Sequence, residues 1–405
     1  MSYVDLLKLF HMDKDQYNEE YELRIRSDNC VWLDYDIKGY AAFYLDNSEV
    51  KELMYSILKK DKQVYKLSKV LPGVALNQYI EKSIIDEIVV TNNIEGVNST
   101  RREIGDTLEV LQQHLTEKKK DVRFLGLIDR YLKLINGSNM PLLTCENVRE
   151  LYDEIVLSEV KSEDVNNYPD GKLFRKGPVS IESSTGKEIH HGKVTEKAIV
   201  EYMNKALLFL NDESVESLYR NCIFHYMIED IHPFYDGNGR LGRFIFCYGV
   251  SKELEPIVVY HISKTIKNNI KKYYYAFEVC GDERNKGDLT PFLIMMLSMI
   301  DMAYDEVQES LTDSISLFNR YKSMIHMLDE SDNKQIGELY GYLIQAALFS
   351  ENGISLRDLL ELMDLSYITL KKRLEIVEKQ NLLILNKIGK SNYYMMNLRT
   401  LDNME

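Results

Sequence analysis

The chain has 405 residues, of which 45% are hydrophobic and 28% are charged, so it can build hydrophobic cores for roughly two to three domains. Its five cysteines are far apart and form no CxxC pair, which argues against a zinc site or a disulfide framework. The net charge of −14 disfavours nonspecific nucleic-acid binding by the whole molecule. The N-terminal residues do not resemble a signal peptide, and no apolar run is long enough for a membrane span. We therefore expect a cytoplasmic protein that is not embedded in a membrane.

Most long segments show the apolar spacing of helices. The predicted helical segments before His232 are 76–90, 101–120, 123–135, 145–157, 195–210 and 216–231. Residues 174–192 differ, because Val179 and Ile181 alternate with other residues ahead of a Ser-Ser-Thr-Gly turn. This pattern predicts a β-hairpin in a mainly α-helical protein, and a lone hairpin needs a neighbour or a ligand to be stable.

The C-terminal residues have the pattern of a separate domain. Three helical segments, two of them preceded by an N-capping serine, are followed by two short strands around a turn. The helical segments are Ile336–Phe349, Leu356–Met363 after Ser355 and Tyr367–Gln380 after Ser366, and the strands are Leu382–Leu385 and Tyr393–Met396 around Gly389. This order predicts a winged helix-turn-helix.

The most informative stretch runs from His232 to Arg243. A predicted helix precedes it, Pro233 disfavours helical geometry at His232, and an apolar second helix follows. The Gly-Asn-Gly sequence at 237–239 allows the backbone to come close to a ligand. Because amide groups at a helix N-terminus attract negative charge, the loop predicts an anion site.

Charged side chains complete this site. Arg240 and Arg243 share a face of the second helix, and each can grip a phosphate through bidentate bonds. Asp236 stands where a Mg²⁺ ion bridging phosphate oxygens would be held, and His232 can take a proton from an incoming hydroxyl. Each residue alone is more often structural, but all of them together favour phosphate chemistry.

The stretch from His232 to Arg243 resembles the complete signature of the Fic family, and in particular of its AMP-transferring branch. The resemblance implies that His232 is the general base, that Phe234 anchors the loop, and that Asp236 binds Mg²⁺, with Mn²⁺ as an alternative. The residues implied to bind the ATP phosphates are Gly237, Asn238, Gly239, Arg240 and Arg243. AMP would pass from ATP to a Tyr, Thr or Ser hydroxyl of a target protein, or of the chain itself, and pyrophosphate would leave.

The sequence from Thr91 to Gly96 resembles the inhibitory motif of the same family. The resemblance implies that Thr91 and Glu95 share a helix face and that Glu95 reaches Arg243, which blocks productive seating of the γ-phosphate. The alternative interpretation is an ordinary helix end with Gly96 as its cap.

Two further segments resemble parts of the family fold. The hairpin resembles the flap, which pairs with target backbone, and this implies target contacts at Val179, Ser180 and Ile181. Residues 260–277 resemble the segment near the adenosine pocket, where Tyr274 is the candidate on the adenine side. A surface hairpin and core packing of aromatic residues are the respective alternatives.

These features predict four parts. They are an N-terminal helical region at 1–122 with the inhibitory helix at 77–96, a Fic catalytic core at 123–302, a helical linker at 303–333 and a winged helix at 334–405. The family habit implies a homodimer. The basic third helix of the winged domain fits DNA, but the acidic chain favours protein contacts or dimerisation. Two other functions stay open, namely an ATP-sensing DNA-binding regulator and an enzyme that removes AMP with the help of Glu95.

Overall fold

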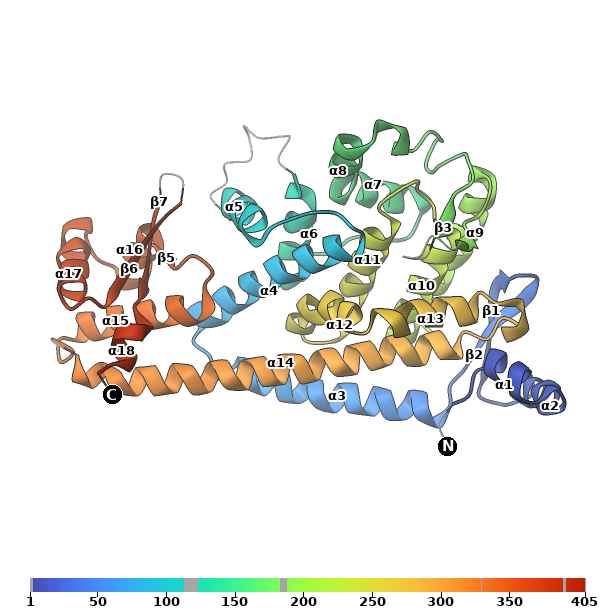
Figure 1. Cartoon of the computed structure of the whole chain (residues 1–405), viewed down its shortest axis with the longest axis horizontal. Helices are drawn as coiled ribbons and strands as arrows, with labels where there is room; N and C mark the ends of the chain where they lie inside the picture. The colour runs from blue at the N-terminus through green and yellow to red at the C-terminus, as the bar shows by residue number, and fades with distance from the viewer. Residues whose placement is uncertain (1–2, 113–122, 183–187, 329, 389–390, 405) are drawn as a thin grey trace. The chain divides into compact units, whose positions relative to one another are not determined.

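The computed structural model describes residues 3–112, 123–182, 188–328, 330–388 and 391–404, most of which are helical (Figure 1). The chain forms two compact units, each assembled from two segments: residues 1–62 with 84–305, and residues 63–83 with 306–405. In the described part of the chain, no helix is both long and apolar enough to cross a membrane. The predicted mainly α-helical class is confirmed, and the four-part domain division stays a prediction.

The N-terminal region combines helices with a β-hairpin. Its elements are α1 (Leu6–Met12), α2 (Lys14–Ile25), β1 (Cys30–Ile37), β2 (Tyr40–Leu45) and α3 (Ser48–Ser68). Asp5 and Asp13 cap the two short helices by accepting backbone N–H groups of the first turn. Lys38 and Gly39 both have positive φ and form the turn between β1 and β2. This hairpin was not predicted, although Leu33, Tyr35 and Ile37 alternate with two aspartates and are the buried positions of β1.

Seven helices and the C-terminal part of α4 (Gly73–Ile94) form the centre of the first unit, while residues 73–83 of α4 belong to the second unit. The seven helices are α5 (Arg101–Gln112), α6 (Leu125–Ile135), α7 (Cys145–Ile155), α8 (Leu157–Glu163), α9 (Glu196–Leu210), α10 (Ser217–Ile231) and α11 (Asn238–Glu253). Together with α4, they confirm the predicted helical segments, except that residues 113–120 lie outside the described residues. Helix α10 packs against both α9 and α11 and is buried on nearly every side (Figure 1). The loop that follows its C-terminal residue, Ile231, therefore begins inside the unit.

The predicted hairpin is present between α8 and α9. It consists of β3 (Ser180–Glu182) and β4 (Glu188–His191), which pair antiparallel with Ser180 opposite His191. A short 3-10 turn at Val165–Asn167 precedes it. In the described residues, β3 and β4 form a sheet of two strands, so one edge of β3 has no neighbouring strand.

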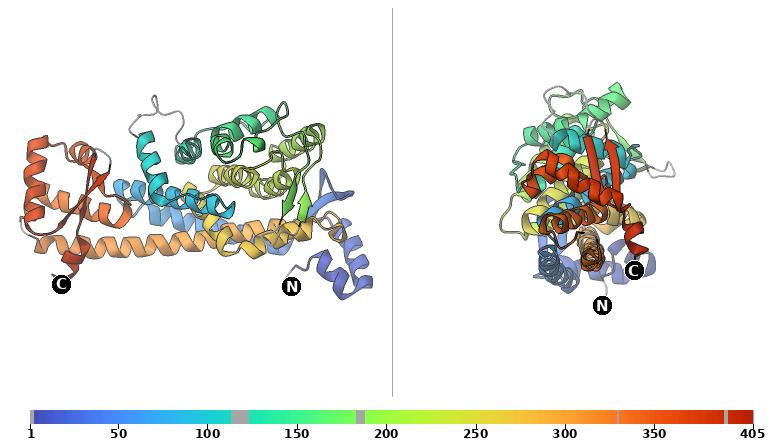
Figure 2. Two further views of the ribbon diagram at one scale, coloured as in Figure 1. Left: turned by 45° about the horizontal axis from the view of Figure 1, so that its top comes forward. Right: turned by 90° about the vertical axis from the view of Figure 1, so that its left-hand side faces the viewer.

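The first unit is completed by α12 (Ile262–Asn268), α13 (Ile270–Cys280) and the start of α14 (Thr290–Met324). Two 3-10 turns at Pro256–His261 and Glu283–Asn285 connect these helices. Figure 2 shows α14 as a single helix, which continues without a break past the predicted boundary at residue 302.

The second unit contains the predicted tail elements. They are α15 (Lys334–Phe349), β5 (Ile354–Ser355), α16 (Leu356–Met363), α17 (Tyr367–Lys379), β6 (Leu383–Ile388), β7 (Ser391–Met396) and α18 (Leu398–Asp402), after a 3-10 turn at Ile325–Met327. Ser355 and Ser366 cap α16 and α17 as predicted. The three strands have the order β5-β7-β6, and the predicted turn at Gly389 lies outside the described residues. The winged-helix assignment stays a prediction.

Candidate active site

The predicted anion loop lies between α10 and α11. Helix α10 ends at Ile231, and His232 adopts a left-handed conformation (φ 51°) while its N–H donates to the Ile228 carbonyl at 2.9 Å. Pro233 cannot continue the helix because it has no backbone N–H. Gly237, also left-handed at φ 80°, precedes the first turn of α11. The His232 side chain is 16% exposed and stands at the rim of the loop.

Asn238 and Phe234 hold the loop in this shape. The Asn238 carboxamide accepts the Phe234 N–H and donates to the Phe234 carbonyl, each at 2.9 Å. The buried Phe234 ring stacks on Tyr152 with 3.6 Å between the ring centroids. The Asn238 side chain is thus used inside the loop, whereas the amide groups of the first turn of α11, including that of Gly239, have no acceptor within the helix.

Arg240 is a buried cation at this helix start. Its side chain is 1% exposed, and its guanidinium lies 3.8 Å from the Asp236 carboxylate and 3.9 Å from that of Glu159. Among the described residues, none of its three nitrogens has a hydrogen-bond partner. Buried donors without partners are costly, and the planar fork of arginine donors matches a phosphate. The surroundings of Arg240 therefore suit an anionic ligand.

Asp236 supplies the carboxylate of the loop. Its side chain is 32% exposed, and its Oδ1 atom accepts the N–H of Gly237. Within the described residues, no group of three or more His, Cys, Asp or Glu side chains could hold a metal ion by itself. A Mg²⁺ ion needs only one or two carboxylates when substrate phosphates supply other ligands. Asp236 fits such an ion.

Arg243 is the second buried arginine of α11, and all three of its nitrogens have partners. Nε donates to Thr91 Oγ1 at 2.8 Å, Nη1 to Glu95 Oε1 at 2.8 Å, and Nη2 to the Thr91 carbonyl at 3.1 Å. Burial lowers the pKa of Arg243, but the charge of Glu95 acts in the opposite direction and leaves that pKa above its ordinary value. The two residues of the predicted inhibitory motif therefore both contact Arg243.

Glu95 also lies against the start of α11. Helix α4 ends at Ile94, and Gly96, with φ 74°, lets the chain turn away. A Cβ atom built on Gly239 would lie only 2.3 Å from Glu95 Oε1, so the carboxylate occupies the space over the Gly239 backbone. Gly96 thus ends the helix, as the alternative interpretation held, while Glu95 also contacts Arg243. The carboxylate stands beside the amide groups that an anion would use.

Glu229 is a site residue that the sequence analysis missed. It lies on α10, and its Oε2 atom is 4.0 Å from His232 Nδ1. Burial, followed by the negative charge of Glu95, raises the pKa of Glu229 to about 8, while Arg243 opposes the shift. Its position three residues before His232, on the same helix face, is the signal that could have identified it.

The remaining predicted residues have less contact with the loop. Tyr274 on α13 is 43% exposed, and burial, followed by the charge of Glu95, raises its pKa. Val179 precedes β3, and its carbonyl accepts the N–H of Gly192 at 3.3 Å. Ser180 and Ile181 form the first residues of β3, and only their backbone is described.

These features define a class of site. It is a helix–loop–helix anion site with a histidine at its rim and two buried arginines within. An acidic residue directly after another helix is bound to the second arginine. Residues 142–248, which end within α11, match the model of the Fic/DOC family, so the chain contains a Fic domain. The match includes the loop from His232 to Arg243 but neither Glu95 nor Tyr274.

A solved structure confirms the fold. The crystal structure of a Fic family protein from Desulfovibrio desulfuricans G20 superposes with a TM-score of 0.51 at 18% sequence identity, over 87% of this chain and 97% of that one. The predicted Fic-type helical fold is therefore confirmed.

Curated relatives match the chain at modest identity. Protein adenylyltransferase fic-1 of Caenorhabditis briggsae is 25% identical over 229 residues, which are 54% of this chain and 40% of that protein. Protein adenylyltransferase Fic of Drosophila virilis is 26% identical over 240 residues, which are 57% of this chain and 44% of that protein. The chain thus spans less than half the length of these relatives.

Proposed function

We propose that this chain is a protein adenylyltransferase that moves AMP from ATP to a Tyr, Thr or Ser hydroxyl of a target protein, and also of itself. The observation that carries this proposal is Arg240, a buried guanidinium without a hydrogen-bond partner in the described structure, at the N-terminus of a helix and beside the Asp236 carboxylate. The names of the curated relatives support the same reaction.

Each residue of the loop has its own role in the reaction. His232 takes the proton of the target hydroxyl, whose oxygen attacks the α-phosphorus of ATP. The bond from the α-phosphorus to the bridging oxygen breaks, and pyrophosphate leaves. Arg240 and Arg243 hold the β- and γ-phosphates, and the amide groups at the start of α11 receive phosphate oxygens. Positioning and charge stabilisation therefore supply most of the catalysis.

The metal ion would bind at Asp236. Mg²⁺, or Mn²⁺ in its place, would neutralise charge on the α- and β-phosphates when bound. Asp236 would hold the ion through its carboxylate, which is 32% exposed.

Glu95 would inhibit the enzyme by competing with ATP. Its carboxylate holds Arg243 and lies over Gly239, so a phosphate cannot use either group until Glu95 moves. Hydrogen bonds to charged groups are stronger than neutral ones, and this favours the inhibited arrangement.

Target binding would use the free edge of β3. Because β3 pairs only with β4 in the described residues, an extended target segment could add a strand beside Val179, Ser180 and Ile181. A homodimer and DNA contact by the second unit remain proposals from the sequence, and DNA is the less favoured of the two.

Transfer of label from ATP tests the proposal. The purified chain is incubated with Mg²⁺ and ATP labelled at the α-phosphate, alone and with cell lysate. Replacing Glu95 by Ala removes a charged hydrogen bond from the inhibited state, so labelling should rise roughly 10- to 100-fold. Thr91→Val should give a smaller rise, because it removes one partner of Arg243 and leaves Glu95 in place.

Matched controls separate the outcomes. Glu52→Ala removes an exposed carboxylate of α3 and should leave labelling unchanged. Adding His232→Ala to Glu95→Ala should abolish labelling, and ATP labelled at the γ-phosphate should give none. If Glu95→Ala binds ATP yet labels no protein, the adenylyltransferase proposal is wrong. The result would then favour an ATP-sensing regulator. If wild type removes AMP from modified protein and Glu95→Ala does not, the reaction runs toward removal.

A further inference from the structure

Arg175 is a buried arginine outside the phosphate site, and every hydrogen bond of its side chain goes to a backbone carbonyl. It lies in the segment before β3, and its side chain is fully buried. Nε donates to the His232 carbonyl at 2.8 Å, Nη2 to the Ile231 carbonyl at 3.4 Å, and Nη1 to the Gly177 carbonyl. Its own N–H donates to the Pro233 carbonyl at 3.1 Å.

Burying Arg175 costs folding stability, but its hydrogen bonds hold the backbone around His232 in place. Burial lowers the pKa of Arg175, and no carboxylate pairs with it in the described structure. A buried cation without an anionic partner is costly, although the last carbonyl groups of α10 carry the negative end of the helix dipole and partly offset the cost. Arginine suits the position because its rigid fork can reach two carbonyl groups at once.

The same bonds fix the backbone of His232. This residue is left-handed at φ 51°, a conformation that non-glycine residues adopt rarely and keep only when their surroundings enforce it. Arg175 binds the carbonyl of His232 and those of the residues on both sides of it. These hydrogen bonds from Arg175 therefore help to fix the backbone conformation of His232, and with it the direction of its side chain.

Both ends of the β3–β4 hairpin attach to the same place. Before β3, the N–H of Gly177 donates to the Tyr235 hydroxyl at 2.9 Å. After β4, the N–H of Lys193 donates to the Ile231 carbonyl at 3.1 Å. A Cβ atom built on Gly192 would lie 2.4 Å from Arg175 Nη2 and 2.8 Å from the His232 Cβ, so hairpin, guanidinium and histidine are in direct contact.

We propose that Arg175 is a positioning residue that fixes His232 relative to the hairpin, so that a target hydroxyl held beside β3 meets the imidazole. The proposal rests on the proposed function. Arg175 takes no part in binding the phosphates, which lie at α11. Its loss should therefore lower kcat for AMP transfer without weakening ATP binding.

Three variants test this in the Glu95→Ala background. Arg175→Met removes the fork, and Arg175→Lys keeps the charge with fewer directed bonds. Arg149→Met is the matched control, because Arg149 also donates to a backbone carbonyl of this segment, that of Leu173 at 2.9 Å, but is not bonded to His232. The measurements are kcat and KM for AMP transfer, the Kd for ATP, the melting temperature, and the NMR signals of the His232 imidazole.

Arg175→Met should lower kcat about 100-fold, the effect of a misplacement of about 1 Å, with the Kd for ATP unchanged. Arg175→Lys should restore part of kcat, Arg149→Met should leave kcat unchanged, and the imidazole signals should shift only in the Arg175 variants. If Arg175→Met does not fold, Arg175→Lys carries the comparison. Unchanged kcat and imidazole signals in a destabilised Arg175 variant would overturn the proposal. Absence of transfer in the Glu95→Ala parent would instead contradict the proposed function, while the imidazole signals would still decide the role of Arg175.

Discussion

At the scale of single residues, Glu229 shows how closely the inhibitory contact and the histidine are coupled. Its carboxyl is buried within 4.0 Å of the His232 imidazole, and the charges of Glu95 and Arg243 act on its pKa in opposite directions. The raised value of about 8 means that the carboxyl keeps its proton at neutral pH in the folded chain. Glu95 pairs with Arg243, whereas Glu229 is a buried carboxyl with a raised pKa.

Replacing Glu229 by Gln should change how stability depends on pH. The ordinary pKa of the carboxyl is 4.5, so between that pH and about 8 the unfolded chain loses a proton that the folded chain keeps. The free energy of unfolding of the wild type therefore falls through this window, while Gln has no proton to lose. At about 1.4 kcal/mol per pKa unit, Glu229→Gln should gain a few kcal/mol over the wild type from pH 5 to pH 8.

Urea unfolding at a series of pH values measures this difference. Glu87, another buried carboxyl with its pKa raised to about 7 by burial, contributes a similar slope to both proteins and cancels in the comparison. Glu52→Gln, at an exposed carboxylate, should show no such gain. A gain that is the same at every pH would contradict the raised pKa of Glu229.

The site was predictable where its residues are neighbours in the sequence. The stretch from His232 to Arg243 has a fixed spacing, so glycines, charges and helix boundaries could be placed together. The contact of Glu95 with Arg243 joins residues 148 positions apart, and only the resemblance to a family indicated it. Arg175 gave no such pattern, because an isolated arginine in a sequence looks like an exposed one until packing buries it. The signal for Glu229 was its spacing of three residues from His232.

At the scale of elements, the periodic helices were predicted better than the connections between them. Helices α6, α7 and α9 carry clear apolar faces, whereas α10 is buried on nearly every side and its place at the centre of the unit did not follow from its pattern. The β1–β2 hairpin was missed although β1 alternates buried apolar residues with aspartates, because its turn, Lys38-Gly39, is a weak sequence signal. Local patterns report which faces are buried, and not which neighbour buries them.

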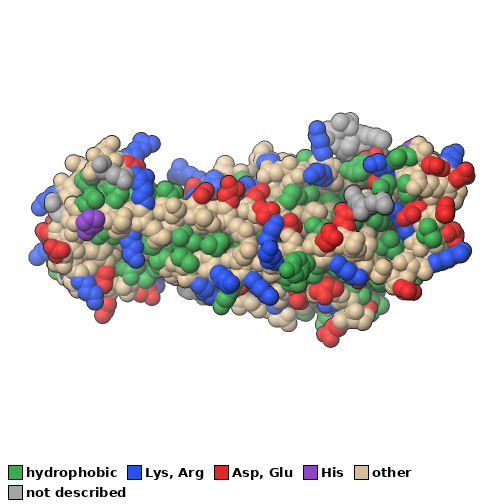
Figure 3. Space-filling model, turned by 90° about the horizontal axis from the view of Figure 1, so that it is seen from below, with side chains coloured by type: hydrophobic (Ala, Val, Ile, Leu, Met, Phe, Trp, Pro, Cys, Tyr) green, Lys and Arg blue, Asp and Glu red, His purple; other side chains and the backbone are tan. Residues whose placement is uncertain are grey.

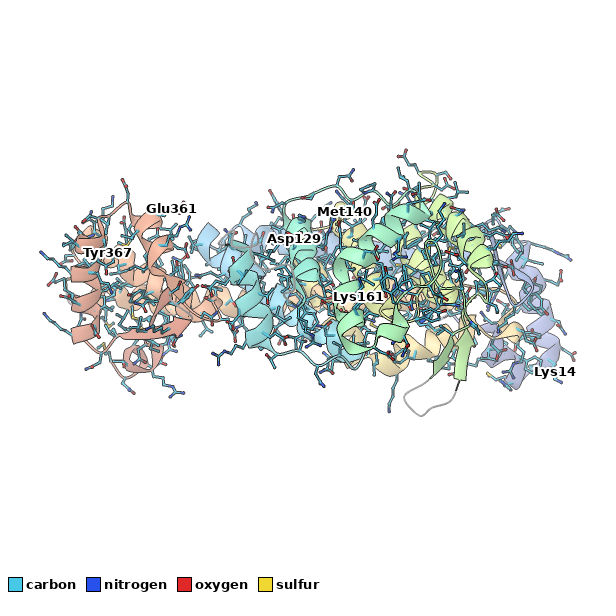
Figure 4. All side chains as sticks on the ribbon, turned by 90° about the horizontal axis from the view of Figure 1, so that it is seen from above. Lys14, Asp129, Met140, Lys161, Glu361 and Tyr367 are labelled. Carbon is cyan, nitrogen blue, oxygen red and sulfur yellow. The ribbon has the colours of Figure 1, made fainter. Side chains whose placement is uncertain are left out.

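Helix α17 of the second unit bears on the DNA alternative. Lys371 donates to the Tyr394 hydroxyl at 3.0 Å, and Arg373 donates to Gln335, so two of its basic side chains are engaged within the unit. The start of α17 is instead apolar, with Tyr367 56% and Ile368 68% exposed (Figure 4). Figure 3 shows lysines and arginines interspersed with acidic side chains on one face of the molecule. These features favour a protein partner over a phosphate backbone.

We expect the chain to bind duplex DNA no more tightly than about 1 μM at physiological salt, which is the range of nonspecific binding. Fluorescence anisotropy with a labelled duplex measures this, and the residual affinity should fall steeply as salt is added. Lys372→Glu, at an exposed position of α17, is the matched variant. Tight binding that Lys372→Glu abolishes would favour DNA as the partner of this unit.

At the scale of the whole molecule, the two units share helices. Residues 63–83, which include the start of α4, belong to the second unit. The end of α4 with Thr91, and Glu95 directly after it, belong to the first. Within the second unit, Tyr79 of α4 donates to Ser310 at 3.0 Å, and Gln308 donates to Gln63 of the preceding helix α3 at 2.9 Å. The helix that carries the inhibitory residues is therefore stabilised in part by residues after 305.

A chain that ends at residue 305 should consequently have a weakened inhibitory helix. Without residues 306–405, Tyr79 in the first half of α4 loses its Ser310 partner, and amide hydrogen exchange at 73–83 should speed up while α10 and α11 stay protected. Because Glu95 lies at the end of the same helix, AMP transfer should rise toward the level of Glu95→Ala. Adding Glu95→Ala to the shortened chain should then give little further increase, since both changes act on one contact. Unchanged exchange at 73–83, or full additivity of the two changes, would show that Glu95 is held by the first unit alone.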